Sequence, residues 1–257
     1  MTEYRFLSTS VANGLATLTI AKPPVNVLDI AAMEEMESAL GALAADPSVR
    51  LLVIAAAGGK AFSAGVQVAD HTSDKVERMI EVFHAVIRRI EAFPAPTLAA
   101  VNGAALGGGL EVALACDMIV AAAGAKLGQP EIKLAVFPPV AAILLPRLLP
   151  PTKANELLYG GGVITAEEAL QYGLVNRVFA REGFAAEVAA FSRPFLENSG
   201  AALSVTKKAI RLAANRSFEE ALQAVETLYL KELMATYDAK EGLDAFLNKR
   251  KPVWRHE

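Results

Sequence analysis

Residues 96–117, PTLAAVNGAALGGGLEVALACD, restrict the possible fold more than any other stretch of the chain. Residues 97–101 are apolar and follow a proline, which is typical of a strand covered on both faces. Three glycines follow at 107–109, and the residues after them are apolar, with Glu111 near their start. The stretch therefore predicts a buried strand that leads through a glycine turn into a helix.

The glycine turn has the properties of an anion-binding site. Glycines lack Cβ atoms and so expose backbone N–H groups, and a helix N-terminus adds free N–H groups and the positive end of the helix dipole. Such donors can hold an oxygen that gains negative charge during a reaction. Glu111 follows Gly108 by three residues, roughly 5 Å along a helix axis. We therefore expect proton transfer beside an activated carbonyl; the alternative is a glycine-packed helix start with an acid that suits the dipole.

Strand-like and helix-like segments alternate along most of the chain, which indicates an α/β fold built from repeated ββα or βαβ units. From about residue 198 the pattern becomes wholly helical, so we expect an α/β body at 1–197 and a helical region at 198–257. The segments with the clearest patterns are a hairpin at 4–21, helices at 30–45 and 73–93, strands at 51–57 and 118–123, a polar turn at 127–131, and a capped helix start at 165–169.

Composition and charge exclude several classes of protein. With 257 residues, of which 53% are hydrophobic, the chain can bury a large core. A net charge of −3 gives no electrostatic case for binding nucleic acid. No secretory signal and no apolar run of membrane-spanning length is evident, and a single cysteine, Cys116, suits a reducing compartment. We expect a cytoplasmic protein with neither nucleic acid nor membrane as its partner.

Several segments follow the order and spacing of the enoyl-CoA hydratase/isomerase (crotonase) superfamily, which the chain resembles over nearly its full length. The resemblance implies a crotonase-like spiral of ββα units and a C-terminal helical region that mediates homotrimers or homohexamers. It also implies an acyl-CoA thioester substrate, no separate cofactor and no metal. The matching segments are AFSAGV at 61–66, AVNGAALGGG at 100–109, CD at 116–117, GQPE at 128–131, and residues 169–175.

The resemblance assigns catalytic roles to four positions. The backbone N–H groups of Val66 and Gly108 would bind the thioester oxygen and stabilise an enolate, and Glu111 and Glu131 would divide the proton transfers. Adding water to a double bond needs both a base and an acid, whereas isomerases of the family generally manage with the position of Glu131. The pair therefore favours a hydratase, which is a hydro-lyase, over two structural glutamates. It also disfavours a non-catalytic member that binds acyl-CoA or RNA.

The acyl pocket departs from the usual hydratase pattern. Pro139 and Val140 stand where straight-chain hydratases have a glycine-rich run, and Pro139 has no N–H with which to hold the water. Asp70 and His71 would border the same pocket. We therefore expect a shorter or differently shaped pocket and a water molecule held by other groups.

Residues 65–72 and 136–140 together are similar to those of cyclohexa-1,5-diene-1-carbonyl-CoA hydratases within the family. These enzymes act in anaerobic degradation of aromatic compounds through benzoyl-CoA, and they yield 6-hydroxycyclohex-1-ene-1-carbonyl-CoA. A compact ring substrate would suit the altered pocket. The alternatives are a general 2-enoyl-CoA hydratase and an enoyl-CoA isomerase.

The coenzyme A portion of the substrate is expected at two places. By the resemblance, the backbone around Val25, Val27 and Ala64 contacts the pantetheine or adenine end. Lys251 and Trp254 in the C-terminal tail would meet the nucleotide phosphates of the same or a neighbouring subunit. The alternative for this tail is a solvated, charged chain end.

Overall fold

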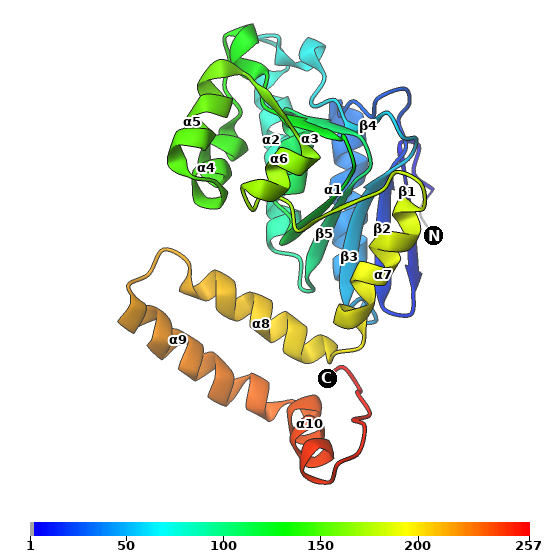
Figure 1. Cartoon of the computed structure of the whole chain (residues 1–257), viewed down its shortest axis with the longest axis vertical. Helices are drawn as coiled ribbons and strands as arrows, with labels where there is room; N and C mark the ends of the chain where they lie inside the picture. Colours follow the sequence, from blue (N-terminus) through cyan, green and yellow to red (C-terminus); the bar gives the residue numbers. More distant parts are fainter. Residues whose placement is uncertain (1–2) are drawn as a thin grey trace.

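The computed structural model describes residues 3–257, which form two β-sheets, helices packed on them and a C-terminal group of helices (Figure 1). The strands are β1 Leu7–Ala12, β2 Leu15–Ile20, β3 Leu51–Ala56, β4 Ala61–Ser63, β5 Thr97–Val101, β6 Ala104–Leu106, β7 Met118–Ala122, β8 Lys126–Gly128, β9 Val163–Thr165 and β10 Arg177–Phe179. The α-helices are α1 Ile30–Ala44, α2 Val76–Glu91, α3 Gly108–Leu114, α4 Pro139–Leu148, α5 Pro151–Gly160, α6 Ala166–Gln171, α7 Phe184–Leu196, α8 Gly200–Ala213, α9 Phe218–Lys231 and α10 Tyr237–Leu247. Short 3₁₀ helices lie at η1 Val68–His71, η2 Glu131–Leu134 and η3 Leu233–Ala235.

The larger sheet has the strand order β1-β2-β3-β5-β7-β10. The β1–β2 pair is the predicted hairpin, and Asn13 and Gly14 at its turn both have positive φ, as this tight turn requires. The remaining neighbours pair in parallel. A parallel sheet needs cover on both faces, which explains the continuous apolar runs of the sequence.

The two faces of this sheet are buried against different helices. On β5, Ala99 and Val101 belong to the main core, together with residues of α1 and α2. Leu98 and Ala100 point to the other face and belong to a smaller cluster, which α7 covers through Val188. The alternation follows from the two-residue period of a strand, so β5 is buried at every position.

A smaller sheet of order β4-β6-β8-β9 lies beside the larger one. The chain repeatedly runs from a strand of the large sheet to a strand of the small sheet and then to a helix, as in β3-β4-α2 and β5-β6-α3. The predicted α/β spiral of ββα units is therefore confirmed. The prediction of a polar turn at 127–131 was wrong at its start, because Leu127 and Gly128 pair with β6 and β9.

The predicted C-terminal helices are present as α8, α9 and α10, which lie below the α/β body in Figure 1. Lys207 of α8 fixes them to the body: its buried ammonium group lies 2.7 Å from Asp117 and donates to the Ala95 carbonyl oxygen at 3.0 Å. Within residues 3–257, no helix is both long and apolar enough to span a bilayer.

Candidate active site

A cavity of about 580 Å³ lies where the small sheet, α2, the start of α3 and the segment before α4 meet. It brings together the four residues predicted to be catalytic: Val66, Gly108, Glu111 and Glu131. Its wall also includes three of the expected substrate contacts, namely Ala64, His71 and Pro139. The positions that were predicted to be catalytic therefore converge on one cavity from segments that are far apart in the chain.

The backbone N–H groups of Val66 and Gly108 are available to a ligand. Leu28 bonds to the residues on either side of Val66, since its N–H donates to the Gly65 carbonyl oxygen and its own carbonyl oxygen accepts from Gln67. In this isolated β-bridge between Leu28 and Val66, the N–H group of Val66 is not bonded to Leu28. The Gly108 N–H belongs to the first turn of α3, where no carbonyl oxygen within the helix can accept it. Both residues line the same cavity, so their N–H groups are placed where the predicted oxyanion-binding pair would be.

The glycine turn is required by close packing around these donors. Gly107 has a φ of +53°, and a Cβ at this position would overlap Oε1 of Glu131. A Cβ at Gly108 would lie 2.7 Å from Cγ2 of Val66 and 3.3 Å from the ring of Phe83. Distances below 3 Å are not compatible with unstrained packing. The glycines therefore allow the two N–H groups and one carboxylate to approach each other.

Glu111 is held by the N-terminus of α4. Its Oε1 accepts hydrogen bonds from the N–H groups of Val140 and Ala141, both at 2.8 Å. Pro139 occupies the first helical position, where a missing N–H costs nothing. The N–H groups that follow Pro139 thus orient the Glu111 carboxyl group through Oε1, and its other oxygen, Oε2, takes no part in these bonds.

The environment of Glu111 favours its protonated form. Its side chain is 3% exposed, and burial raises the pKa of this carboxyl to about 7, with a further rise from the negative charge of Glu131. The two hydrogen bonds from α4 act in the opposite direction but do not offset burial. Burial also raises the pKa of Glu131. Two carboxyl groups in such a site can hold a proton near neutral pH, as acid–base catalysis requires.

Gln129 is a site residue that the sequence reasoning missed. Its side chain is fully buried, and with the amide nitrogen turned toward Glu131 it donates to both carboxylate oxygens, at 3.0 and 3.1 Å. The reverse orientation would set the amide oxygen against a carboxylate, so the donating orientation is the physical one. The signal was its place in the GQPE segment, two residues before Glu131.

Of the predicted pocket residues Asp70, His71 and Val140, only His71 lines the cavity. Val140 contributes through its N–H to Glu111. Asp70 lies outside the cavity wall, where its buried carboxylate accepts from the Ile30 N–H at 3.2 Å. His71 does line the cavity, and its Nδ1 lies 3.2 Å from the Gln67 carbonyl oxygen.

Of the predicted coenzyme A contacts, one group lies at the cavity and the other lies away from it. Val25 is bonded to a residue of the cavity wall, because its carbonyl oxygen accepts a hydrogen bond from the Ala64 N–H at 2.9 Å. Val27 follows in the same loop. Trp254 lies away from the cavity and donates from its indole nitrogen to the Glu197 carbonyl oxygen. Lys251 is exposed in the same tail. Within one chain, therefore, only the first group adjoins the site.

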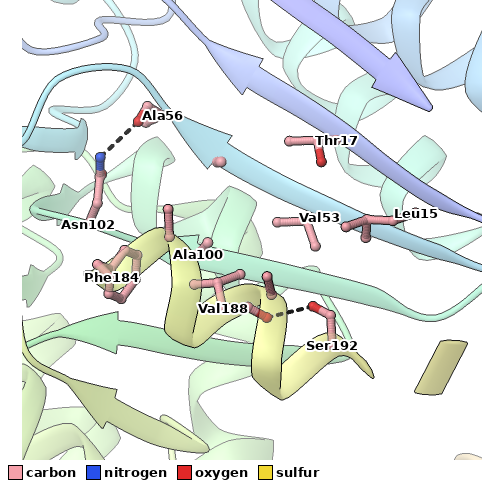
Figure 2. Close-up of a pocket in the computed structure, with 12 residues that line it drawn as sticks. Leu15, Thr17, Val53, Ala56, Ala100, Asn102, Phe184, Val188 and Ser192 are labelled. Atoms are coloured by element: carbon pink, nitrogen blue, oxygen red, sulfur yellow. Dashed lines mark hydrogen bonds between the residues drawn. The ribbon is translucent and has the colours of Figure 1, made fainter. Parts of the chain in front are cut away.

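A second cavity, of about 260 Å³, lies between α7 and the outer face of the large sheet, and Figure 2 shows the side chains that surround it. Its walls are formed mainly by alanine, valine and leucine, with polar groups from Thr17, Asn102 and Ser192. It contains no ionisable side chain, so it lacks the acid and base that the first cavity has.

Neither a reactive thiol nor a cluster of metal ligands is found in residues 3–257. Cys116 is buried, and burial raises the pKa of its thiol strongly, which disfavours the reactive thiolate. Across the same residues, no cluster of three or more His, Cys, Asp or Glu side chains has an arrangement that could hold a metal ion.

The ββα spiral, with two backbone donors facing two carboxyl groups in one cavity, defines a crotonase-type protein. The chain belongs to the enoyl-CoA hydratase/isomerase family, whose sequence profile it matches over residues 10–257. The predicted resemblance is thus confirmed. Membership of this family implies an acyl-CoA substrate.

Individual relatives support the same family. The chain is 38% identical to cyclohexa-1,5-dienecarbonyl-CoA hydratase of Thauera aromatica, an alignment that covers 94% of this chain and 93% of the relative. It is also 38% identical to crotonyl-CoA hydratase of Syntrophomonas wolfei, with 92% and 93% covered. The crystal structure of an enoyl-CoA hydratase from Bacillus anthracis superposes with a TM-score of 0.94 at 31% identity, covering 98% of this chain and all of that chain. These homologues are hydro-lyases, so the predicted enzyme class is confirmed at the level of the family.

Proposed function

We propose that this protein adds water to a conjugated dienoyl- or enoyl-CoA thioester, with cyclohexa-1,5-diene-1-carbonyl-CoA as its substrate and 6-hydroxycyclohex-1-ene-1-carbonyl-CoA as its product. The observation that carries the proposal is the convergence of Glu111 and Glu131 on the cavity that also presents the N–H groups of Val66 and Gly108. An isomerase needs only one proton-transferring group, whereas hydration uses two.

In this mechanism the thioester oxygen accepts hydrogen bonds from Val66 and Gly108. These donors stabilise the negative charge that reaches the oxygen when the hydroxyl group of water adds to the carbon β to the carbonyl. Addition to the ring diene produces a dienolate, and a proton then adds at the far end of the dienolate. Water thereby gives its hydroxyl group to the β-carbon and its remaining proton to one carboxyl group, and a carboxyl group gives a proton to the far carbon, so that one water molecule is added in total.

Glu111 and Glu131 hold the water and move its protons. Pro139 offers no N–H, and the Val140 and Ala141 N–H groups are already bonded to Glu111 Oε1, so the water is bound by the carboxyl groups themselves. A proton carried by Glu111 resides on Oε2, because Oε1 already accepts two hydrogen bonds. Gln129 donates to Glu131 and thereby favours its ionised form.

The preference for a ring substrate is inferred from the shape of the pocket. Relatives with equal identity are named for a ring dienoyl thioester and for crotonyl-CoA, so identity alone does not choose between them. Pro138 and Pro139 line the cavity here, and their fixed backbone and ring atoms leave less room for a flexible chain. A flat, compact acyl group fits such a wall better.

The test compares wild type, Glu111→Gln and Glu131→Gln on both thioesters, with products separated by chromatography. We expect the wild type to hydrate the ring diene in preference to crotonyl-CoA, and each variant to lose hydration by at least about a hundredfold, since each removes one proton-transferring group. A Glu111→Gln variant that retains most of its turnover would instead indicate an isomerase. Full activity on crotonyl-CoA with an inert diene would contradict the ring assignment only.

We further propose that the helices of residues 198–257 join three copies of the chain, with trimers pairing into hexamers as a further step. Large apolar side chains on α8–α10 are exposed in the single chain, and exposed apolar patches of this kind mark interaction surfaces. The most exposed are Ile210 at 69%, Phe218 at 80%, Leu230 at 65%, Phe246 at 82% and Leu247 at 78%.

Such an assembly would give the C-terminal tail a role that one chain does not provide. Lys251 and Trp254 would then contact the nucleotide end of coenzyme A bound to a neighbouring subunit, in the cytoplasm, where the thioester pool is expected. Light scattering tests the assembly, and Lys251→Ala should weaken coenzyme A binding in the oligomer several-fold. A monomer in solution, or unchanged coenzyme A affinity, would contradict these two statements respectively.

A further inference from the structure

Ala135 holds a backbone conformation that alanine rarely adopts. It ends η2 with φ +59° and ψ +29°, in the left-handed region. L-residues pay an energetic penalty there because Cβ approaches the following carbonyl oxygen, whereas glycine does not. The other non-glycine residues with positive φ in residues 3–257 are Asn13, Asn26, Asn215, Lys249 and His256.

The place of Ala135 distinguishes it from those residues. It is the member of that set which lines the active-site cavity. Its N–H donates to the Ile132 carbonyl oxygen at 3.0 Å, a bond that glycine would make equally well. Residues in such strained backbone conformations cluster at active sites and ligand-binding sites, so the presence of a methyl group at this position requires an explanation.

The residues next to Ala135 in the chain also border the cavity. Ala135 lies four residues after Glu131, and Leu134, Val136 and Phe137 border the same cavity. These side chains are exposed in the chain, with Leu134 at 59%, Val136 at 38% and Phe137 at 68%. They form an apolar wall close to a catalytic carboxyl group, which is where an acyl group would be bound.

We propose that Ala135 is a specificity-determining residue, whose methyl group narrows the acyl pocket and favours compact acyl groups over long chains. The proposal rests on the acyl-CoA hydratase function proposed above. It adds that pocket width is set at the bend after η2 as well as at Pro138 and Pro139. Glycine at this position would remove the strain and the methyl group together.

The test uses Ala135→Gly and Ala135→Asn, with Asn215→Gly as a matched control. Asparagine tolerates the left-handed conformation but adds bulk, so it separates strain from size. Asn215 also has positive φ, at 63°, and it lies outside the residues that line the cavity. The readouts are kcat/KM for the ring dienoyl, crotonyl and 2-octenoyl thioesters, and the Kd of octanoyl-CoA and benzoyl-CoA, which are not hydrated.

We expect Ala135→Gly to raise the 2-octenoyl-to-ring ratio of kcat/KM about tenfold or more, as a methyl-sized change in a pocket does, and to tighten octanoyl-CoA relative to benzoyl-CoA. Ala135→Asn should lower both ratios, and Asn215→Gly should change neither. Unchanged ratios in both Ala135 variants, with an active wild type, would overturn the inference. A wild type that hydrates no thioester would refute the proposed function, and the two Kd values would still test the pocket.

Discussion

Replacement of Glu111 by glutamine should stabilise the protein at alkaline pH while it removes hydration activity. Glu111 is buried, and its pKa is about 7 in the folded chain against 4.5 for the ordinary carboxyl group. The folded state therefore binds more protons than the unfolded state between these values, and stability falls as pH rises through that window. Glutamine remains neutral and can still accept hydrogen bonds from Val140 and Ala141 through its amide oxygen.

The magnitude follows from the size of the shift. A difference of roughly 2.5 pKa units corresponds to about 3 kcal/mol at pH values above both pKa values, and to less than about 1 kcal/mol near pH 5. For a chain of this size, about 3 kcal/mol raises Tm on the order of 5–10 °C. The measurement is urea unfolding and calorimetry of wild type and Glu111→Gln at about pH 5 and about pH 8.5, with the exposed Glu226→Gln as control.

The decisive quantity is the pH dependence of the difference, because a change in packing would shift stability equally at both pH values. If Glu111→Gln is no more stable than wild type at alkaline pH, or if its advantage is the same at acidic pH, the buried carboxyl is not destabilised in the way described. Activity measured on the same samples should be absent at both pH values.

The remaining predictions concern the supports of the site and of the helical region. Gly107→Ala should lower kcat about a hundredfold with little change in the Kd of an acyl-CoA, because a Cβ would displace the Glu131 carboxylate; an unchanged kcat would contradict this. Gln129→Leu should raise the pKa of Glu131 by removing hydrogen bonds to its ionised form, so the Glu131-dependent limb of the pH–rate profile should move to higher pH; a lower kcat with an unmoved limb would indicate a purely structural role. Lys207→Ala should destabilise the protein by about 2 kcal/mol, since it removes the hydrogen bond to the Ala95 carbonyl oxygen and the ion pair with Asp117. Hydrogen exchange in α8 should then increase, and unaltered exchange there would show that Lys207 does not hold the helices in place.

Much of the fold follows from local patterns in the sequence. The hairpin at Asn13-Gly14, the strand at 97–101 and the capped start of α6 were predicted from turn residues, apolar runs and capping chemistry, and all three are present. The short strands β4, β6 and β8 were not predicted as strands. Each has only three residues, which is too short for an alternating pattern, and long-range pairing determines their conformation.

The candidate site, like the fold, could be predicted from the sequence only in part. Glu111 was singled out from the glycine turn beside it, whereas Glu131 was assigned a role only through the resemblance to the crotonase superfamily. The support of Glu111 by α4 and of Glu131 by Gln129 depends on contacts between segments or on side-chain orientation, which no spacing rule provides. Asp70 was expected to border the cavity. Its carboxylate instead accepts a hydrogen bond from the first residue of α1, and it is not among the residues that line the cavity.

The central claim is that two carboxyl groups in one cavity add water to a conjugated acyl-CoA. The most direct measurement is turnover of cyclohexa-1,5-diene-1-carbonyl-CoA and crotonyl-CoA in oxygen-18 water, with mass analysis of the products. The account predicts a labelled hydroxyl group in the product of the ring diene, formed faster than that of crotonyl-CoA, and no label with Glu111→Gln. A rearranged product without label, or no product from either thioester, would contradict it.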